Sequence, residues 1–462
     1  MNKDWGLAHI ADSPGGKMVS QKMEPIRVVD TLTPKIITEP KPGVYVFDTE
    51  QNLAGWASLT VEGERGREIT LKFAETLYDD GLVNQENLRN AKATDTYILK
   101  GEGVETWEPK FTYHGFRYVQ VEGLPHAPKV GDIRVKIVRN AVAPVGKFHC
   151  SNELLNRIHR MVVATEASNL HGVPTDCPQR DERMGWLNDL TVRIEQAVYN
   201  FDFSRFYAKF IDDIADTQHE DGTITCVAPY RFGARPADPV SASYLLLAWK
   251  SYEYYGNRNI IRDHYDGLKG WVDYLASRTQ DGIVDYSYYG DWSPPTQFAA
   301  APGSAVSRDT PGQLMSTGYL YYCASMLSKM AELTGRDSDK ARYAQLAERT
   351  AEAFNRTYWN EQTGGYAANN QAANSFALFL GIVDETRIPR VVKNLADDVE
   401  KHDYHLTTGN LCTKYLMEML TRYGHAETAY RIATQTTYPS WGYMLQNGAT
   451  TLWERWEYAT GD

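Results

Sequence analysis

One charged stretch marks the turning point of the chain: Thr175-Asp176-Cys177-Pro178-Gln179-Arg180-Asp181-Glu182-Arg183-Met184-Gly185-Trp186-Leu187-Asn188-Asp189. It combines four carboxylates and two arginines with a cysteine and a tryptophan. So many charges cannot be buried unpaired, because taking a carboxylate out of water costs several kcal/mol or shifts its pKa. A solvated loop gains nothing from Cys177 and Trp186. Two interpretations carry equal weight: a polar pocket with an aromatic wall, or a salt-bridged loop between two helices.

The sequence on both sides of this stretch has the period of α-helices. Ser151 is a good N-cap, and Leu154, Ile158 and Val162 follow it at helical spacing. Ten further helices are predicted at roughly 187–199, 203–217, 240–256, 258–277, 310–334, 338–359, 369–382, 386–401, 408–423 and 425–437. Such a series favours an (α/α)6 barrel, a six-hairpin toroid, over residues 146–462. A closed toroid needs twelve helices, so the eleven predicted leave it without its last helix.

The preceding residues alternate with the period of β-strands. Ile69, Leu71 and Phe73 alternate with polar neighbours, as in a half-buried strand. Further strands are predicted at 94–99, 111–122 and 132–138, separated by glycine-containing turns. This pattern predicts a β-sandwich over residues 41–140. Residues 1–40, interrupted by prolines and glycines, are expected to be irregular.

The composition excludes several classes of function. The chain has 462 residues, is 42% hydrophobic and carries a net charge of −11, which argues against a nucleic-acid partner. No apolar run approaches the roughly 18 residues of a membrane span. Met1-Asn2-Lys3-Asp4-Trp5 lacks the apolar core of a signal peptide, so a cytoplasmic location is expected by default. Five scattered cysteines without a CxxC pair predict neither a metal site nor a disulfide framework, and no cofactor is expected.

A second candidate cluster lies near the other end of the chain, in Gly448-Ala449-Thr450-Thr451-Leu452-Trp453-Glu454-Arg455-Trp456-Glu457. Glu454 stands between two tryptophans and beside an arginine, which suits either a general base or an ion pair at a helix end. Glu182 is the matching candidate for a general acid, since neighbouring carboxylates and burial favour protonation. Asp176 and Asp189 are expected to stay ionised and to bind hydroxyl groups. Two carboxylates that face each other across a barrel are what glycoside hydrolysis requires.

Two aromatic stretches are weaker candidates. Tyr289-Gly290-Asp291-Trp292 lies in a long loop, where functional residues tend to collect, and Pro439-Ser440-Trp441-Gly442-Tyr443 lies before the second cluster. Taken alone, an ordinary turn and an ordinary core tryptophan are the better interpretations. The thirty tyrosines and eleven tryptophans of the chain suit sugar rings, but they also fill cores.

The two charged motifs resemble those of the bacterial α-L-rhamnosidases of glycoside hydrolase family 78. Residues 176–186 are similar to the acid motif of that family, and residues 448–456 to its base motif. The run Trp107-Glu108-Pro109-Lys110-Phe111-Thr112-Tyr113-His114-Gly115-Phe116-Arg117-Tyr118-Val119 resembles the concanavalin-like β-sandwich that precedes the catalytic domain. The resemblance covers nearly all of the chain from about residue 25.

This resemblance implies an inverting hydrolysis of terminal α-L-rhamnose on a small-molecule or oligosaccharide rhamnoside. Glu182 would be the general acid and Glu454 the general base that activates water. The residues expected to bind the sugar or shape its pocket are Asp176, Arg180, Asp189, Trp186, Asp291, Trp292, Trp441 and Trp453.

Family members continue beyond the base motif, so the chain is expected to be C-terminally truncated. An unclosed barrel would expose a seam that a second copy of the chain could cover. The oligomeric state is therefore left open, with a homo-oligomer as one option. The alternatives are a different glycosidase on the same toroid, a non-catalytic rhamnoside-binding protein and a purely structural helical scaffold.

Overall fold

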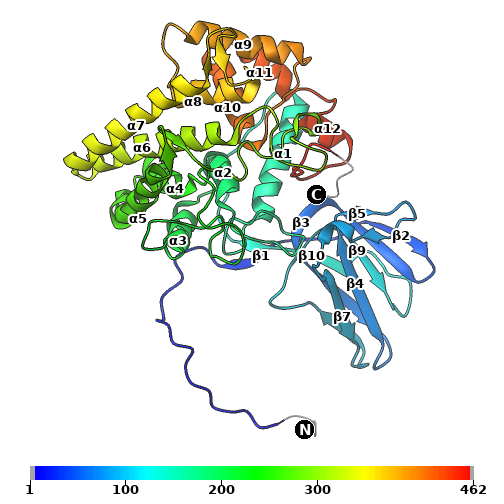
Figure 1. Cartoon of the computed structure of the whole chain (residues 1–462). Coiled ribbons are helices and arrows are strands. Elements are labelled where there is room, and N and C mark those ends of the chain that lie inside the picture. Colours follow the sequence, from blue (N-terminus) through cyan, green and yellow to red (C-terminus); the bar gives the residue numbers. More distant parts are fainter. Residues whose placement is uncertain (1–5, 458–462) are drawn as a thin grey trace.

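The computed structural model describes residues 6–457, so the N-terminal pentapeptide discussed above and residues 458–462 lie outside it. Residues 6–22 run as an exposed, irregular segment away from the body of the molecule (Figure 1). A sheet domain follows, and a larger helical domain comes after it. The predicted order of a β-sandwich followed by an α/α barrel is confirmed.

The sheet domain is an antiparallel sheet that curls around its own core. Its eight strands are β1 (Ile26–Leu32), β2 (Ile36–Lys41), β3 (Val44–Glu62), β4 (Glu68–Ala74), β7 (Thr94–Ile98), β8 (Val104–Trp107), β9 (His114–Glu122) and β10 (Ile133–Asn140). Beside them lie a small hairpin of β5 (Thr76–Leu77) and β6 (Val83–Asn84) and the 3-10 turn η1 (Glu86–Leu88).

The long strand β3 connects the two layers of this sandwich. Its first half pairs with β2 and β9, and its second half pairs with β10 and β8. Phe47 and Leu59 of β3 are fully buried with Phe116 and Ile133 of the neighbouring strands in one core. The same strand therefore contributes to both faces that enclose the core.

Two strands lie in the segment that was expected to be irregular, so that prediction is wrong for residues 26–40. β1 pairs with β10, and β2 pairs with the first half of β3. The side chains of β1 are almost all exposed. Because it buries no face, β1 lacks the alternation that identifies a half-buried strand, and its place is set by backbone pairing.

All eleven predicted helices are present, with ends that differ by a few residues. They are α1 (Glu153–Ser168), α2 (Leu187–Asn200), α3 (Ser204–Ala215), α4 (Ser243–Tyr255), α5 (Arg258–Ser277), α6 (Gly312–Leu333), α7 (Asp337–Tyr358), α8 (Gln371–Leu380), α9 (Ile388–Lys401), α10 (Asn410–Arg422) and α11 (Ala426–Ala433). Short pieces of structure occupy the loops between them: the two-residue strands β11 (Thr279–Gln280), β12 (Ile283–Val284), β13 (Trp359–Asn360) and β14 (Gly365–Tyr366), and the turn η2 (Thr296–Phe298).

Within the described residues there is one helix more than the eleven predicted, α12 (Trp441–Gln446), which packs on α1 (Figure 1). The Ser440 hydroxyl caps this helix by accepting the Tyr443 amide at 3.0 Å. Its six residues make less than two turns, which is too short for a helical period to show in the sequence.

The helices α2, α4, α6, α8 and α10 form the inner ring of the barrel. α2 packs on α4, α4 on α6, α6 on α8 and α8 on α10, and α10 returns to α2. The odd-numbered helices cover this ring from outside, as α7 covers α6 and α9 covers α8. Inside the ring, Glu195 of α2 lies 2.8 Å from Lys250 of α4 and also pairs with Lys414 of α10. This ion-pair cluster joins three inner helices.

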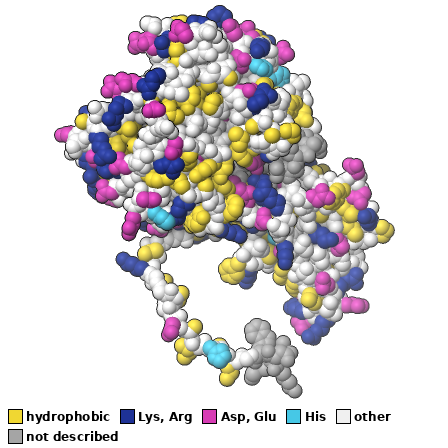
Figure 2. All heavy atoms as spheres, in the orientation of Figure 1, with side chains coloured by type: hydrophobic (Ala, Val, Ile, Leu, Met, Phe, Trp, Pro, Cys, Tyr) yellow, Lys and Arg dark blue, Asp and Glu magenta, His cyan; other side chains and the backbone are white. Residues whose placement is uncertain are grey.

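No helix of residues 6–457 is long and apolar enough to cross a membrane. On the face drawn in Figure 2, basic and acidic side chains lie next to each other where the helical domain meets the sheet domain. The two motifs of interest lie at this junction.

Candidate active site

The loop of residues 176–186, here called the acid loop, lies between α1 and α2 and is closed by its own backbone. The Asp176 amide donates to the Met184 carbonyl at 3.0 Å, and the Asp176 carboxylate accepts the Met184 amide at 2.7 Å. α2 begins directly after Trp186, where the Leu187 amide donates to the Cys226 carbonyl. A Cβ at Gly185 would lie 2.4 Å from the backbone oxygen of Ala228, so the close approach of these two segments requires glycine.

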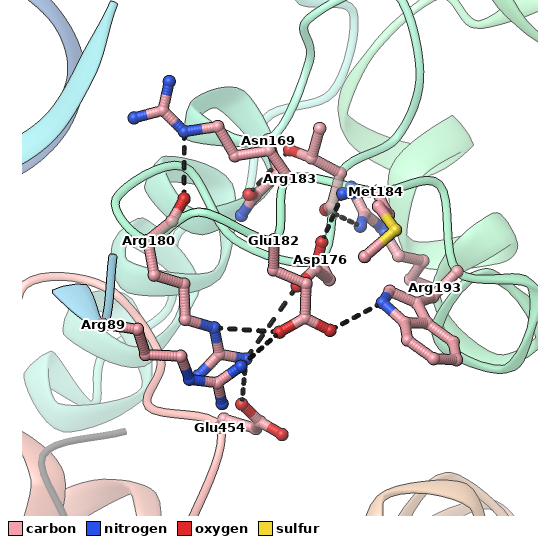
Figure 3. Close-up of polar contacts among 11 residues, drawn as sticks. Arg89, Asn169, Asp176, Arg180, Glu182, Arg183, Met184, Arg193 and Glu454 are labelled. Atoms are coloured by element: carbon pink, nitrogen blue, oxygen red, sulfur yellow. Dashed lines mark hydrogen bonds and ion pairs between the residues drawn. The ribbon is translucent and has the colours of Figure 1, made fainter. Parts of the chain in front are cut away.

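Glu182 points out of the acid loop into a ring of donors (Figure 3). One carboxylate oxygen accepts the Trp186 indole N–H at 2.9 Å. The other lies 3.2 Å from Arg180 Nε and 2.9 Å from Arg89 Nη1. The prediction relied on neighbouring negative charge to favour protonation of Glu182, whereas the structure places the guanidinium groups of Arg180 and Arg89 against its carboxylate, the second of them from the sheet domain.

Arg180 connects Glu182 to Glu454, although 274 residues separate Arg180 from Glu454 in the chain. Its Nη2 donates to the Glu454 carboxylate at 2.8 Å, while its Nε faces Glu182. These two nitrogens of one guanidinium are about 2.3 Å apart by covalent geometry, so the two bound carboxylate oxygens lie at most about 8 Å apart. The two predicted catalytic residues therefore meet at one site.

The two carboxylates differ in their access to solvent. The Glu182 side chain is 17% exposed and that of Glu454 is 42% exposed. A group that activates water must reach water, whereas a group that protonates a leaving oxygen works best where it is shielded. The less exposed residue, Glu182, is the predicted acid, and the more exposed residue, Glu454, is the predicted base, so the two exposures agree with the predicted roles.

The loop of residues 448–456, here called the base loop, packs through its tryptophans. The Leu452 amide donates to the Thr165 hydroxyl of α1 at 2.8 Å. The Trp453 ring packs edge-on against Tyr443 of α12, with ring centroids 6.4 Å apart, and Trp441 packs similarly against Trp456 at 5.8 Å. Trp441 and Trp453 thus form the support of the base loop, and their contact with a sugar remains a prediction.

Two neighbouring carboxyls have a raised pKa, Asp176 of the acid loop and Asp189 in the first turn of α2. Burial, together with the charge of Glu182, raises the pKa of Asp176 to about 6. Burial, followed by the charges of Asp176 and Glu454, raises the pKa of Asp189 to about 7. The expectation that both stay ionised therefore does not hold for Asp189, which is partly protonated near neutral pH, whereas Asp176 is still mostly ionised there. A partly protonated carboxyl donates as well as accepts hydrogen bonds, so Asp189 suits a sugar hydroxyl in either role, and Asp176 suits one that donates.

Asp291 does not line the site as predicted. It is 1% exposed, and its two carboxylate oxygens accept the backbone amides of Gly409 at 2.7 Å and of Cys412 at 2.9 Å, at the start of α10. A carboxylate that satisfies the free N–H groups of a helix start is a structural cap. The long loop is thus tied to α10 through Asp291.

Trp292, next to Asp291, belongs to an aromatic wall beside Glu182. Its ring packs edge-on against Tyr289 with centroids 5.3 Å apart, and Tyr289 packs in the same way against Trp186 at 6.0 Å. Tyr289 also lines a cavity of about 480 Å³ with Tyr286. The aromatic wall predicted for the pocket is therefore built by three residues from two loops.

Sequence reasoning missed Tyr289 and Arg89 as site residues. Tyr289 lay in a stretch already selected, and its aromatic neighbours were the available signal. Arg89 follows η1 with a φ of 56°, in a segment without any motif, and 93 residues separate it from Glu182. No local pattern identifies Arg89, because its role arises from the packing of two domains.

One group in the described chain has metal-binding residue types: Asp176, Cys177 and Glu182, whose ligand atoms lie within 4.8 Å of one another. Arg180 already lies 3.9 Å from Asp176 and 3.2 Å from Glu182. This cluster therefore fits ion pairing better than metal binding.

Comparison with known proteins agrees with this geometry. Residues 143–462 match the bacterial alpha-L-rhamnosidase six-hairpin glycosidase domain, and residues 38–139 match the bacterial alpha-L-rhamnosidase concanavalin-like domain. An alpha-L-rhamnosidase of Streptomyces avermitilis is 36% identical over 96% of this chain and 42% of its own length. One of Formosa agariphila is 31% identical over 94% of this chain and 47% of its own length. The chain spans about half the length of these curated relatives.

Solved structures show the same fold. The α-L-rhamnosidase from Dictyoglumus thermophilum superposes with a TM-score of 0.94 and 44% identity, over 98% of this chain and 51% of that one. The Streptomyces avermitilis enzyme, solved with L-rhamnose, superposes with a TM-score of 0.88 and 34% identity, over 96% and 42% of the two chains. With both domains matched in order, this chain belongs to the bacterial α-L-rhamnosidase family.

Proposed function

We propose that this chain hydrolyses terminal α-L-rhamnosides by a single displacement. The observation that carries the proposal is the guanidinium of Arg180, which binds Glu182 on one nitrogen and Glu454 on another. Two carboxyl groups held this close can act on one glycosidic bond. The relatives named α-L-rhamnosidase, and the one solved with L-rhamnose, support rhamnose as the sugar.

The proposed reaction uses the two carboxyl groups in opposite senses. Glu182 gives its proton to the glycosidic oxygen as the bond from that oxygen to the anomeric carbon breaks. A water molecule attacks the anomeric carbon from the other face, and Glu454 takes the proton that this water loses. The first product is then β-L-rhamnose. Inverting enzymes separate their carboxyl groups by about 6.5–9.5 Å to make room for this water, which is compatible with the upper limit of about 8 Å found here.

The remaining residues of the site have binding roles in this proposal. Asp176 and Asp189 exchange hydrogen bonds with the sugar hydroxyls, and Arg180 keeps the two catalytic carboxyl groups in place. Trp186, Tyr289 and Trp292 offer flat apolar faces to the C–H side of the sugar ring. Trp186 also donates to Glu182, so the same residue orients the acid and borders the sugar.

The proposal is tested with 4-nitrophenyl glycosides of α-L-rhamnose, α-mannose and β-glucuronic acid, assayed side by side. Turnover of the rhamnoside alone is expected. Turnover of another sugar instead would make the chain a different glycosidase on the same fold, because the fold does not determine the sugar. Rhamnose binding by calorimetry without turnover would identify a non-catalytic binder. Proton NMR taken in the first minutes identifies the anomer released, and α-L-rhamnose as the first product would refute single displacement.

A further inference from the structure

The base loop is held from the sheet domain by two residues of β3. The backbone N–H of Asn52 donates to the Thr450 hydroxyl at 2.7 Å, and the side-chain Nδ2 of Asn52 donates to the Thr451 hydroxyl at 3.0 Å. Gln51 Nε2 donates to the Thr450 carbonyl at 3.1 Å. Three hydrogen bonds thus join one short part of β3 to the two threonines that precede Glu454 in the base loop.

A bulge in β3 aims these residues at the base loop. The pairing of β3 with β9 shifts between Asp48 and Leu53, and Glu50 has a φ of 63° there. Asp48 fixes the bulge, since it accepts the Glu50 amide at 2.7 Å and binds Arg117 through both carboxylate oxygens, at 2.8 and 2.9 Å. Bulges of this kind redirect side chains away from a regular ladder, often beside active sites.

The Asn52 side chain is itself fixed by Glu75. Its Nδ2 donates to one Glu75 oxygen at 2.6 Å, and Asn87 donates to the other at 3.0 Å. Burial raises the pKa of Glu75, although the two amides and the nearby Arg180 charge act in the opposite direction. Asn52 therefore cannot rotate freely, because one of its N–H groups is engaged by Glu75 while the other faces Thr451.

We propose that Asn52, oriented by Glu75, is a positioning residue that holds Glu454 at its working distance from the sugar. Thr451 is only three residues from Glu454, and the base loop is anchored on its other side by the bond from Leu452 to Thr165. Without the Asn52 side chain, the bond to Thr451 is lost and the anchor on the sheet side is weakened to the two bonds that reach Thr450. Because a displacement of about 1 Å in a catalytic group costs about 100-fold in rate, the sheet domain is part of the catalytic apparatus. This inference rests on the proposed function.

The test compares Asn52→Ala with Asn394→Ala. Asn394 of α9 is a matched control, since it is also partly buried and also bridges two segments, to Gly364 at 2.9 Å. On the aryl rhamnoside, Asn52→Ala is expected to lower kcat about 10- to 100-fold with little change in KM, and the control is expected to leave both unchanged. An unchanged kcat in Asn52→Ala would overturn the proposal. Should that variant fail to fold, Thr451→Val removes the same contact from the side of the base loop.

Two further measurements exclude a general loss of structure. In a Glu454→Gln background, Asn52→Ala is expected to cost less than about twofold, because a positioning residue has no effect once its target is lost. The same loss in both backgrounds would overturn the proposal. Hydrogen exchange of residues 448–456 should be about tenfold faster in Asn52→Ala than in the wild type, and equal exchange would overturn the tether. Hydrogen exchange does not require activity. It therefore tests the tether between Asn52 and the base loop even if the wild type hydrolyses no rhamnoside and the proposed function fails.

Discussion

The ionised carboxylate of Asp189 should lower the free energy of unfolding, and Asp189→Asn measures by how much. Its pKa of about 7 in the fold compares with 3.8 for an ordinary aspartate. An acid whose pKa is higher in the folded than in the unfolded chain stabilises the fold while it is protonated. That contribution is complete below about pH 4 and is lost as the pH rises through about 7. Ionisation of Asp189 therefore lowers the free energy of unfolding by up to about 4 kcal/mol above pH 7.

The side-chain amide introduced by Asp189→Asn carries no charge at any pH, so this variant should be the more stable protein above neutral pH. The difference in the free energy of unfolding between variant and wild type is expected to widen by about 2–3 kcal/mol from pH 5 to pH 8.5. Urea unfolding at both pH values measures it, with Asp397→Asn on the exposed face of α9 as the control. A difference that does not change with pH would refute the raised pKa. The variant should also raise KM for a rhamnoside, since Asp189 is proposed to bind the sugar.

Three other substitutions test separate parts of the account. Trp186→Phe keeps an aromatic ring, though a smaller one, and removes the N–H that Glu182 accepts, so kcat on an aryl rhamnoside should fall about tenfold or more, at similar KM. Glu166→Gln breaks the buried two-oxygen pairing with Arg193 beneath the acid loop, and urea unfolding should show a loss of about 3–5 kcal/mol; a loss below about 1 kcal/mol would contradict a buried pair. Asp291→Ala should lower the free energy of unfolding by about 1–3 kcal/mol and leave KM unchanged, because its partners are two backbone amides; a raised KM would return it to the sugar pocket.

The helical domain was predictable because most of its helices bury a hydrophobic face, although α8 is buried on almost all sides. Leu154 and Ile158 of α1 lie one turn apart and both pack against the barrel core, and this spacing is visible in the sequence. α12 has only six residues and shows no period. β1 buries no face, so it has no alternation. Both elements owe their place to contacts with distant residues, which a local pattern does not record.

The site was predictable where one motif supplied several of its residues. Asp176, Arg180, Glu182 and Trp186 lie within eleven residues of sequence, and the structure brings them together. The pairing of Glu182 with Glu454 was predicted from two acidic clusters that a barrel can bring face to face, and the resemblance of both motifs to one family supported it.

The parts of the site that were not predicted depend on where the two domains touch. Arg89 and Asn52 come from the sheet domain, and neither stands in a motif that indicates a catalytic role. The rise in the pKa of Asp189 also depends on the fold, since it is caused by burial and by the charges of residues that folding brings close. Asp291 was misassigned because a buried helix cap and a sugar-binding carboxylate look alike in sequence.

The most direct test is release of nitrophenol from 4-nitrophenyl α-L-rhamnopyranoside by the wild type, Glu182→Gln and Glu454→Gln. The account predicts turnover by the wild type and a loss of about 100-fold or more in each variant, with all three folded, because general acid or base catalysis contributes about 10²–10⁴-fold. Variants that hydrolyse the rhamnoside as fast as the wild type would contradict the central claim that these two carboxyl groups carry the reaction.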